Sequence, residues 1–118
     1  MRTIRVVDYL GTPCLLAPEK GETLAAELKI ELQAQNHIQV DFSGYEFLSS
    51  AFLNHAFGQL CIDLNWDTKT FRQRVLITNM EEDDLEDLEL AIDNAQTRRG
   101  LILRGENPDQ YYSSRLPT

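Results

Sequence analysis

The sequence has 118 residues, of which 42% are apolar and 25% charged, and this length and balance fit a single globular domain. Its formal net charge of -8 argues against nucleic acid and anionic membranes as partners, because both present negative phosphates. No stretch approaches the roughly 18 consecutive apolar residues that cross a bilayer. We therefore expect a soluble domain whose partner is a basic or neutral protein.

The first residues and the two cysteines bear on the cellular compartment. Residues 1–7 enter an alternating apolar pattern directly, without the apolar stretch and small-residue cleavage site of a secretory signal. Cys14 and Cys61 lie in apolar segments and lack C-x-x-C spacing, so we expect buried, reduced thiols rather than a disulfide scaffold. These features predict a cytoplasmic protein.

The N-terminal part of the chain predicts three strands and one helix. Residues 3–10 are rich in β-branched side chains, and a Gly-Thr-Pro turn leads from them into the apolar run 14–17, which predicts a hairpin. Over residues 22–34, apolar side chains recur at the spacing of an amphipathic helix. Residues 38–42 alternate between apolar and polar side chains, which is typical of a strand.

The central part predicts a second helix and another strand. Residues 50–64 carry apolar side chains at helical spacing and polar side chains on the other face. Residues 67–71 can form one extra capped turn. Residues 74–78, Arg-Val-Leu-Ile-Thr, are typical of a strand.

A third helix is predicted after this strand. Asn79 is its predicted N-cap, and Glu82 follows three residues later, as in a capping box. Apolar residues continue at helical spacing, and Gly100 can end the helix. The short apolar segment 101–103 predicts a last edge strand, and the polar residues 105–118 predict a C-terminal tail.

The predicted order of elements is β-β-α-β-α-β-α-β. Alternating strands and helices favour a largely parallel sheet, because right-handed crossover connections place the helices on its faces. We expect one domain over residues 1–104, followed by the tail at 105–118.

Residues 38–52, IQVDFSGYEFLSSAF, resemble the central segment of STAS domains, the fold of bacterial anti-sigma-factor antagonists. The shared features are an apolar strand with Asp41, the pair Ser43-Gly44, and an apolar pair before a serine-rich helix start. The Phe-containing helix that follows resembles more closely a STAS-like branch of unknown function. The resemblance implies an α/β fold with a mixed, mostly parallel sheet of about five strands, an N-terminal hairpin and helices packed on the sheet.

The resemblance also implies a regulatory serine. With the apolar pairs aligned, Ser50 falls at the phosphoacceptor of the family's Asp-Ser-Ser-Gly motif, whereas Ser49, Ala51 and Phe52 replace the other three residues. The implied function is that of a non-enzymatic signalling module, switched by phosphorylation through a kinase-type ATPase of the anti-sigma-factor sort.

The residues themselves leave two roles open for these serines. A helix N-terminus offers unpaired backbone N–H groups and a positive dipole end, which would accommodate a phosphate on Ser50 or Ser49. Serine is also among the commonest N-cap residues, so either serine can simply cap the helix. Capping and phosphorylation can coexist.

We expect partner binding through residues 45–50 and the helix that follows. The candidate contact residues are Tyr45, Phe47, Ser49, Ser50, Phe52, Asn54 and His55. An alternative is a constitutive scaffold or homo-oligomeric subunit, in which exposed Tyr45, Phe47 and Phe52 pack on another copy. A distant alternative is a serine hydrolase that uses His55, although neither a nucleophile elbow nor an oxyanion loop accompanies it.

The third predicted helix is strongly acidic. Its acidic residues are Glu81, Glu82, Asp83, Asp84, Glu86, Asp87, Glu89 and Asp93. They can form an acidic docking face, or only a solvated helix surface with favourable charge at its positive end. The chain has neither metal-ligand spacing of Cys or His nor a Gly-rich phosphate loop, so we expect no metal, no cofactor and no enzymatic activity.

Overall fold

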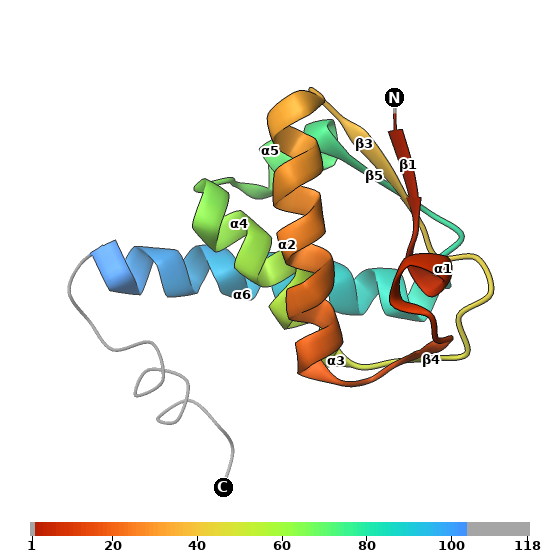
Figure 1. Ribbon diagram of the computed structural model, residues 1–118. Coiled ribbons are helices and arrows are strands. Elements are labelled where there is room, and N and C mark those ends of the chain that lie inside the picture. The colour runs from red at the N-terminus through yellow and green to blue at the C-terminus, as the bar shows by residue number, and fades with distance from the viewer. Residues whose placement is uncertain (1, 104–118) are drawn as a thin grey trace, which may run out of the picture.

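The computed structural model describes residues 2–103, with side chains placed for residues 2–97. Three strands form a parallel sheet in the order β1-β3-β5, and two further strands, β2 and β4, form a separate parallel pair (Figure 1). The strands are β1 (Arg2–Arg5), β2 (Cys14–Leu15), β3 (Ile38–Asp41), β4 (Phe47–Leu48) and β5 (Val75–Thr78). The expected α/β architecture with parallel strands is therefore confirmed.

Helices make up most of the remaining described chain. Residues 50–64 form one uninterrupted helical stretch, whose middle third is a π-helix. The helices are α1 (Val6–Leu10), α2 (Pro18–Ala34), α3 (Ser50–Leu53), η1 (Asn54–Gly58), α4 (Gln59–Leu64), α5 (Thr68–Arg74) and α6 (Glu82–Leu103). Of the helices within residues 2–103, none is both long and apolar enough to traverse a bilayer.

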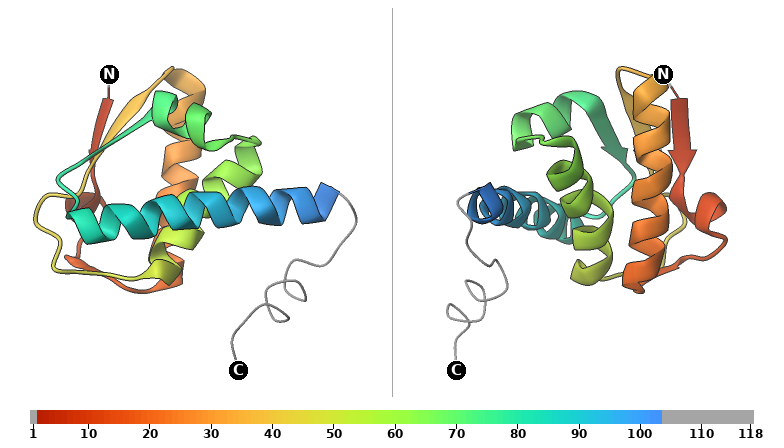
Figure 2. Two further views of the ribbon diagram at one scale, coloured as in Figure 1. Left: turned by 180° about the vertical axis from the view of Figure 1, so that it is seen from behind. Right: turned by 60° about the vertical axis from the view of Figure 1, so that its left-hand side comes forward.

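The core lies between one face of the three-stranded sheet and the helices. Ile4, Val40 and Ile77 stand beside one another in the parallel register and carry the apolar face across the sheet. η1 packs between α2 and α6, and the two views of Figure 2 show α6 running across one side of the helical stretch with α2 on the other. Three fully buried phenylalanines, Phe42, Phe52 and Phe57, fill much of the interior.

Gly21 allows α2 to approach the helical stretch closely. A Cβ atom at this position would lie 2.6 Å from the carbonyl oxygen of Phe52, a distance that real Cβ atoms do not adopt. The close contact between α2 and α3 therefore requires glycine at position 21, because any side chain there would collide with the backbone of α3.

The expected N-terminal hairpin is not found in the described residues. β1 pairs with the distant β3, and β2 pairs with β4, so five strands divide between two sheets instead of forming one. Residues 6–10, expected to continue the first strand, form α1, in which Val6 and Leu10 are four residues apart and both buried. Gly11 ends α1 in the left-handed conformation, with φ 72°, which glycine adopts without strain.

Two expectations for the third helix are wrong. The helix begins at Glu82, and Asn79 adopts a left-handed conformation (φ 59°) before it instead of capping it. α6 also continues to Leu103, so residues 101–103 are helical and not an edge strand. A single glycine such as Gly100 costs a helix only about 1 kcal/mol, which does not suffice to end it. The predicted tail, residues 105–118, lies outside the described residues.

The other elements are close to expectation. α2 begins four residues before the predicted helix, at Pro18, whose fixed φ suits the first turn. The predicted helix over 50–64 is confirmed as a continuous helical stretch. The predicted turn at 67–71 extends to Arg74 and is capped by Asp67, whose Oδ1 accepts from the Thr70 N–H at 2.8 Å. Cys61 is buried as expected, whereas Cys14 is exposed.

Candidate functional site

A compact polar turn follows β3 at the carboxyl end of the sheet's strands. Asp41, the last residue of β3, accepts hydrogen bonds from the Ser43 N–H (2.9 Å), the Ser43 hydroxyl (3.0 Å) and the Asn79 side-chain amide (2.8 Å). Gly44 then takes a left-handed conformation with φ 87°, which favours glycine. The Ser-Gly pair of the sequence motif thus builds the turn.

Arg5 adds a positive charge to this turn. Its Nε donates to the Ser43 hydroxyl at 3.1 Å, and its Nη1 forms an ion pair with Asp8 at 3.1 Å. The Asn79 amide, followed by the Ser43 N–H, holds the pKa of Asp41 below its ordinary value of 3.8. Asp41 is therefore a carboxylate at neutral pH, and its three hydrogen bonds join the turn to the residue that follows β5.

Tyr45 connects the turn to the start of α6. Its hydroxyl donates to Asp84 Oδ2 at 2.5 Å and accepts from the Glu81 N–H at 3.0 Å, while its ring packs edge-on against Phe42. Burial, with the acceptor Asp84, raises the pKa of Tyr45 to about 12. Tyr45 was expected in the exposed partner-binding surface. It is instead half-buried and connects the turn to α6 and to Phe42 in the core.

Phe47 presents its side chain to solvent. It lies in β4 with 58% of its surface exposed, and Leu16, which follows β2, is 45% exposed. The β2–β4 pairing aligns Cys14 with Phe47, so these two short strands carry one small surface with exposed apolar groups. This part of the expected partner surface is accessible.

Ser49 is the N-cap of α3. Its hydroxyl oxygen accepts from the Phe52 N–H at 3.0 Å, and the same hydroxyl donates to the Leu16 carbonyl at 2.8 Å. The capping role anticipated for one of the two serines therefore falls to Ser49. The bond to Leu16 also fastens the start of α3 to the chain just before α2.

Ser50 is the first residue of α3 and is exposed. Within residues 2–103, no hydrogen bond reaches its hydroxyl. The two adjacent serines thus differ sharply, because Ser49 is engaged in two contacts and Ser50 projects freely into solvent.

Phe52 is completely buried, so the expectation that it forms an exposed contact is wrong. Helical geometry explains the difference, since Phe52, Ala56 and Leu60 recur at intervals of four and all three face the core. Phe52 therefore supports the surface from below and offers it no contact.

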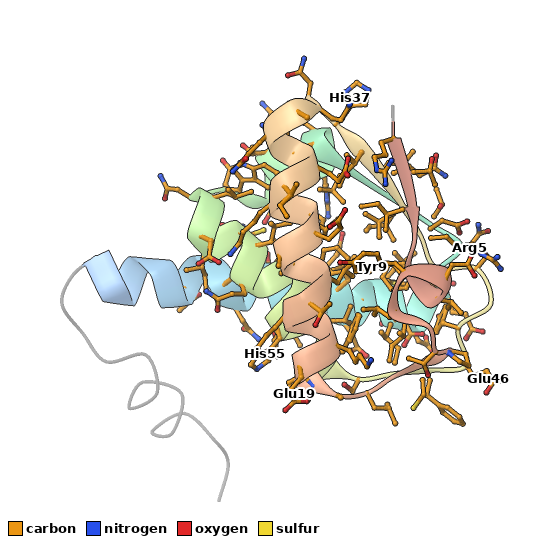
Figure 3. The ribbon with its side chains drawn as sticks, in the orientation of Figure 1. Arg5, Tyr9, Glu19, His37, Glu46 and His55 are labelled. Atoms are coloured by element: carbon orange, nitrogen blue, oxygen red, sulfur yellow. The ribbon has the colours of Figure 1, made fainter. Side chains whose placement is uncertain are left out.

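Asn54 and His55 lie one turn after the serines and are both exposed. Figure 3 shows His55 beside the first turn of α2, where its Nδ1 lies 3.1 Å from Glu22 Oε1. In the described part of the chain, no hydrogen bond joins His55 to Ser49 or Ser50. The arrangement does not bring together the serine–histidine pair considered for a hydrolase.

The π-helix leaves a shallow groove beside these residues. A hollow of about 340 Å³ runs between η1 and α6, lined by Asn54, His55 and Gly58 on one side and Ala91 and Asn94 on the other. A Cβ at Gly58 would lie 3.3 Å from the Ala91 carbonyl, so this glycine helps the two helices to approach. Single π-helical turns within helices are frequent at functional sites.

Two partners in this region were not foreseen. Asn79 was expected to cap a helix but binds Asp41, and Asp84 was one of a run of acids but binds Tyr45. A signal for the first existed, because the residues just after two adjacent parallel strands meet at the same sheet edge. Among the described residues, no cluster of three or more His, Cys, Asp or Glu side chains is arranged to hold a metal ion.

Comparison with known proteins places these elements in a family context. A family model described as a STAS-like domain of unknown function matches residues 20–85, more than half of the chain. The matched region runs from α2 to the first turn of α6 and includes the polar turn, β4 and the helical stretch. Neither curated proteins nor solved structures yield a significant match.

Proposed function

The chain belongs to the family of STAS-like domains of unknown function, and we propose that it is a non-enzymatic regulatory module that binds another protein in the cytoplasm. The binding site is the Ser50 surface, defined as Phe47, Ser50, Asn54 and His55. These four side chains are exposed, lie on β4 and the first turns of the following helix, and belong to elements that are fastened to the core.

The single observation that carries this proposal is the contrast between exposed and engaged side chains around Ser50. Phe47 and Ser50 lie three residues apart and are both exposed, and no described hydrogen bond occupies the Ser50 hydroxyl, while buried Phe52 and the Ser49 cap hold the start of α3. Aromatic side chains dominate the energetics of protein interfaces, so Phe47 is the natural anchor.

Ser50, not Ser49, is the proposed phosphoacceptor. A phosphate on Ser49 would remove the hydrogen that this hydroxyl donates to the Leu16 carbonyl, whereas a phosphate on Ser50 breaks no described contact. It would add a charge of about -1.5 to -2 at the positive end of the helical stretch, where it is tolerated. The fold would remain while the charge of the docking surface changes.

The partner proposed from the resemblance to anti-sigma-factor antagonists is a kinase-type ATPase. Such an enzyme would bind the Ser50 surface and transfer phosphate to it, and the added charge would then weaken docking. The alternative is a constitutive homo-oligomeric scaffold without phosphorylation, which the exposed Phe47 equally favours.

Affinity capture from cells that make the protein tests the proposal with a matched pair of variants. Phe47→Asp places a charge on the Ser50 surface, and Ile30→Asp makes the same change at a 61% exposed position of α2. We expect the partner to be recovered with the wild-type and Ile30→Asp proteins and to be reduced at least about tenfold with Phe47→Asp. Equal recovery with all three proteins would contradict this docking surface.

Mass spectrometry of the captured protein tests the switch separately. We expect phosphate on Ser50, its absence from Ser49, and loss of partner binding in Ser50→Asp but not in Ser50→Ala. If Ser50 is unmodified in the total pool of tagged protein, bound and unbound together, the switch is excluded and the interaction remains. A homo-oligomer in solution that Phe47→Asp dissociates would instead favour the scaffold.

A further inference from the structure

β5 forms an open edge of the three-stranded sheet. The strand order places β3 on one side of β5, and on the other side no strand of the described chain pairs with it. In a parallel ladder, the N–H and C=O of one residue point to the same side and alternate along the strand. Because the Phe42 N–H bonds to the Thr78 carbonyl, Leu76 and Thr78 face β3 whereas Val75 and Ile77 face the open edge.

The open edge still has hydrogen-bonding capacity. The Val75 N–H bonds to the Phe71 carbonyl at the end of α5, which leaves the Val75 carbonyl and both backbone groups of Ile77 directed outward. An added strand can use these groups, and proteins that keep an edge free for this purpose recruit extended peptides in the same manner.

An apolar groove lies beside this edge. It has a volume of about 330 Å³ and runs between β5, the end of α5 and the N-terminal half of α6. Its apolar wall includes Phe71, Leu76, Leu85, Leu88 and Ile92, of which Leu76 and Leu85 are exposed. Alternate side chains of an added strand would point into this groove.

A row of acidic side chains borders the groove on α6. Glu82, Glu86, Glu89 and Asp93 follow one another at intervals of four, three and four, which aligns them along one line of a helix. Glu89 lines the groove and pairs with Arg72, and Asp93 accepts from Thr68, so the row faces α5. Among the described side chains, Glu82 and Glu86 have no basic partner.

We infer that the β5 edge is a second docking site, which takes an extended basic peptide segment of a partner protein as an additional strand. Apolar side chains at alternate positions of the segment enter the groove, and Lys or Arg residues at its ends meet the acidic row. A second copy of this chain fits less well, because each copy carries the same acidic row and a net charge of -8. No residue of this site belongs to the Ser50 surface.

Binding of a synthetic peptide tests the inference on the full-length protein. The probe is a labelled peptide, Lys-Arg-Val-Thr-Val-Thr-Val-Arg-Lys, and the readout is fluorescence anisotropy with amide chemical-shift mapping. We expect saturable binding that shifts Val75–Thr78 most. We expect no binding of the analogue in which Glu replaces every Lys and Arg, or of one with N-methylated alternate amides, because charge and backbone pairing are both required.

Two double variants provide the matched control. Glu82→Lys with Glu86→Lys reverses charge in the acidic row. Asp83→Lys with Asp87→Lys makes the same charge change about 100° around α6 from the row, farther from the groove. We expect the first to weaken binding at least about tenfold and the second by less than about threefold. If both double variants weaken peptide binding equally, the binding is general charge attraction and the proposed site is wrong.

Three further outcomes are decisive. Phe47→Asp should leave peptide binding unchanged, so the β5 edge and the Ser50 surface can fail separately. Shifts that map away from β5, or tight binding of the N-methylated peptide, would overturn strand addition. A dimer in solution that pairs through β5 and excludes the peptide would replace the peptide with a second copy as the occupant.

Discussion

Two neighbouring segments of the chain use polar and aromatic side chains in opposite ways. In the turn at residues 41–45, Asp41, Ser43 and Tyr45 direct their polar atoms toward other parts of the fold. A few residues later, the Phe47 ring and the Ser50 hydroxyl are exposed to solvent. The residues that most resemble the STAS motif therefore build the fold, and the neighbouring segment is left available for recognition.

The largest expected effect comes from removing Tyr45. Tyr45→Ala should lower the free energy of unfolding by about 3 kcal/mol, because it removes the ring packed on Phe42 and leaves Asp84 and the Glu81 N–H without their partner. Urea denaturation measures this, and Phe47→Ala, on an exposed phenylalanine, should change it by less than about 0.5 kcal/mol. Similar losses in both variants would erase the distinction between the segments.

A smaller effect is expected from Asp41. Asp41→Ala should lower the free energy of unfolding by about 2 kcal/mol, since Ser43 and Asn79 lose a charged acceptor. Asn79→Ala removes only one of these bonds and should cost about half as much. Urea denaturation checks both values. An Asp41→Ala variant with an unchanged free energy of unfolding would mean that the turn does not depend on the Asp41 carboxylate.

The two adjacent serines should differ by a further step. Ser49→Ala removes the cap of α3 and should cost about 1 kcal/mol, whereas Ser50→Ala should be neutral within about 0.3 kcal/mol. Thermal unfolding of both variants tests this difference. A Ser50→Ala variant as unstable as Ser49→Ala would assign Ser50 a structural role and weaken its candidacy as a phosphoacceptor.

The smallest expected effect is a dependence of stability on pH. The pKa of Asp41 is lower in the folded chain than its ordinary value of 3.8, so its carboxylate stabilises the fold above that value, and this contribution is lost as the pH falls through the folded pKa. The difference in unfolding free energy between the wild-type protein and Asp41→Asn should therefore shrink as the pH falls below about 4. A constant difference down to pH 2 would show that the charge of Asp41 plays no part.

Local pattern predicted the elements whose side chains alternate or recur along the sequence. β3, β5 and the helical stretch were predicted in this way. The same pattern placed Ser49 and Ser50 at the start of a helix, where one of them was expected to be the cap. The buried position of Phe52 was available from the same pattern, because it precedes Ala56 and Leu60 at helical spacing. Its aromatic side chain next to two serines was instead interpreted as a contact.

Pairing between distant segments could not be predicted from local pattern. The sequence from β1 to β2 is as compatible with a hairpin as with two separate parallel partners, and only the packing of β1 on β3 and of β2 on β4 decides between them. Asn79 shows the same limit, since the capping-box spacing to Glu82 is a local signal and its bond to Asp41 is not. The β5 edge was not predicted either, because residues 101–103 were expected to form an edge strand and instead extend α6.

The pairing of β1 with β3 and of β3 with β5 has a consequence for how the chain acquires its fold. Each of these ladders joins segments separated by a helix-containing connection, so loop-closure entropy must be lost before a strand contact is gained. β3 is the central strand, and β1 has no neighbour until β3 has been synthesised. On the ribosome, the N-terminal strand therefore lacks its partner while α2 is being synthesised, and the three-stranded sheet is complete only after β5 has emerged.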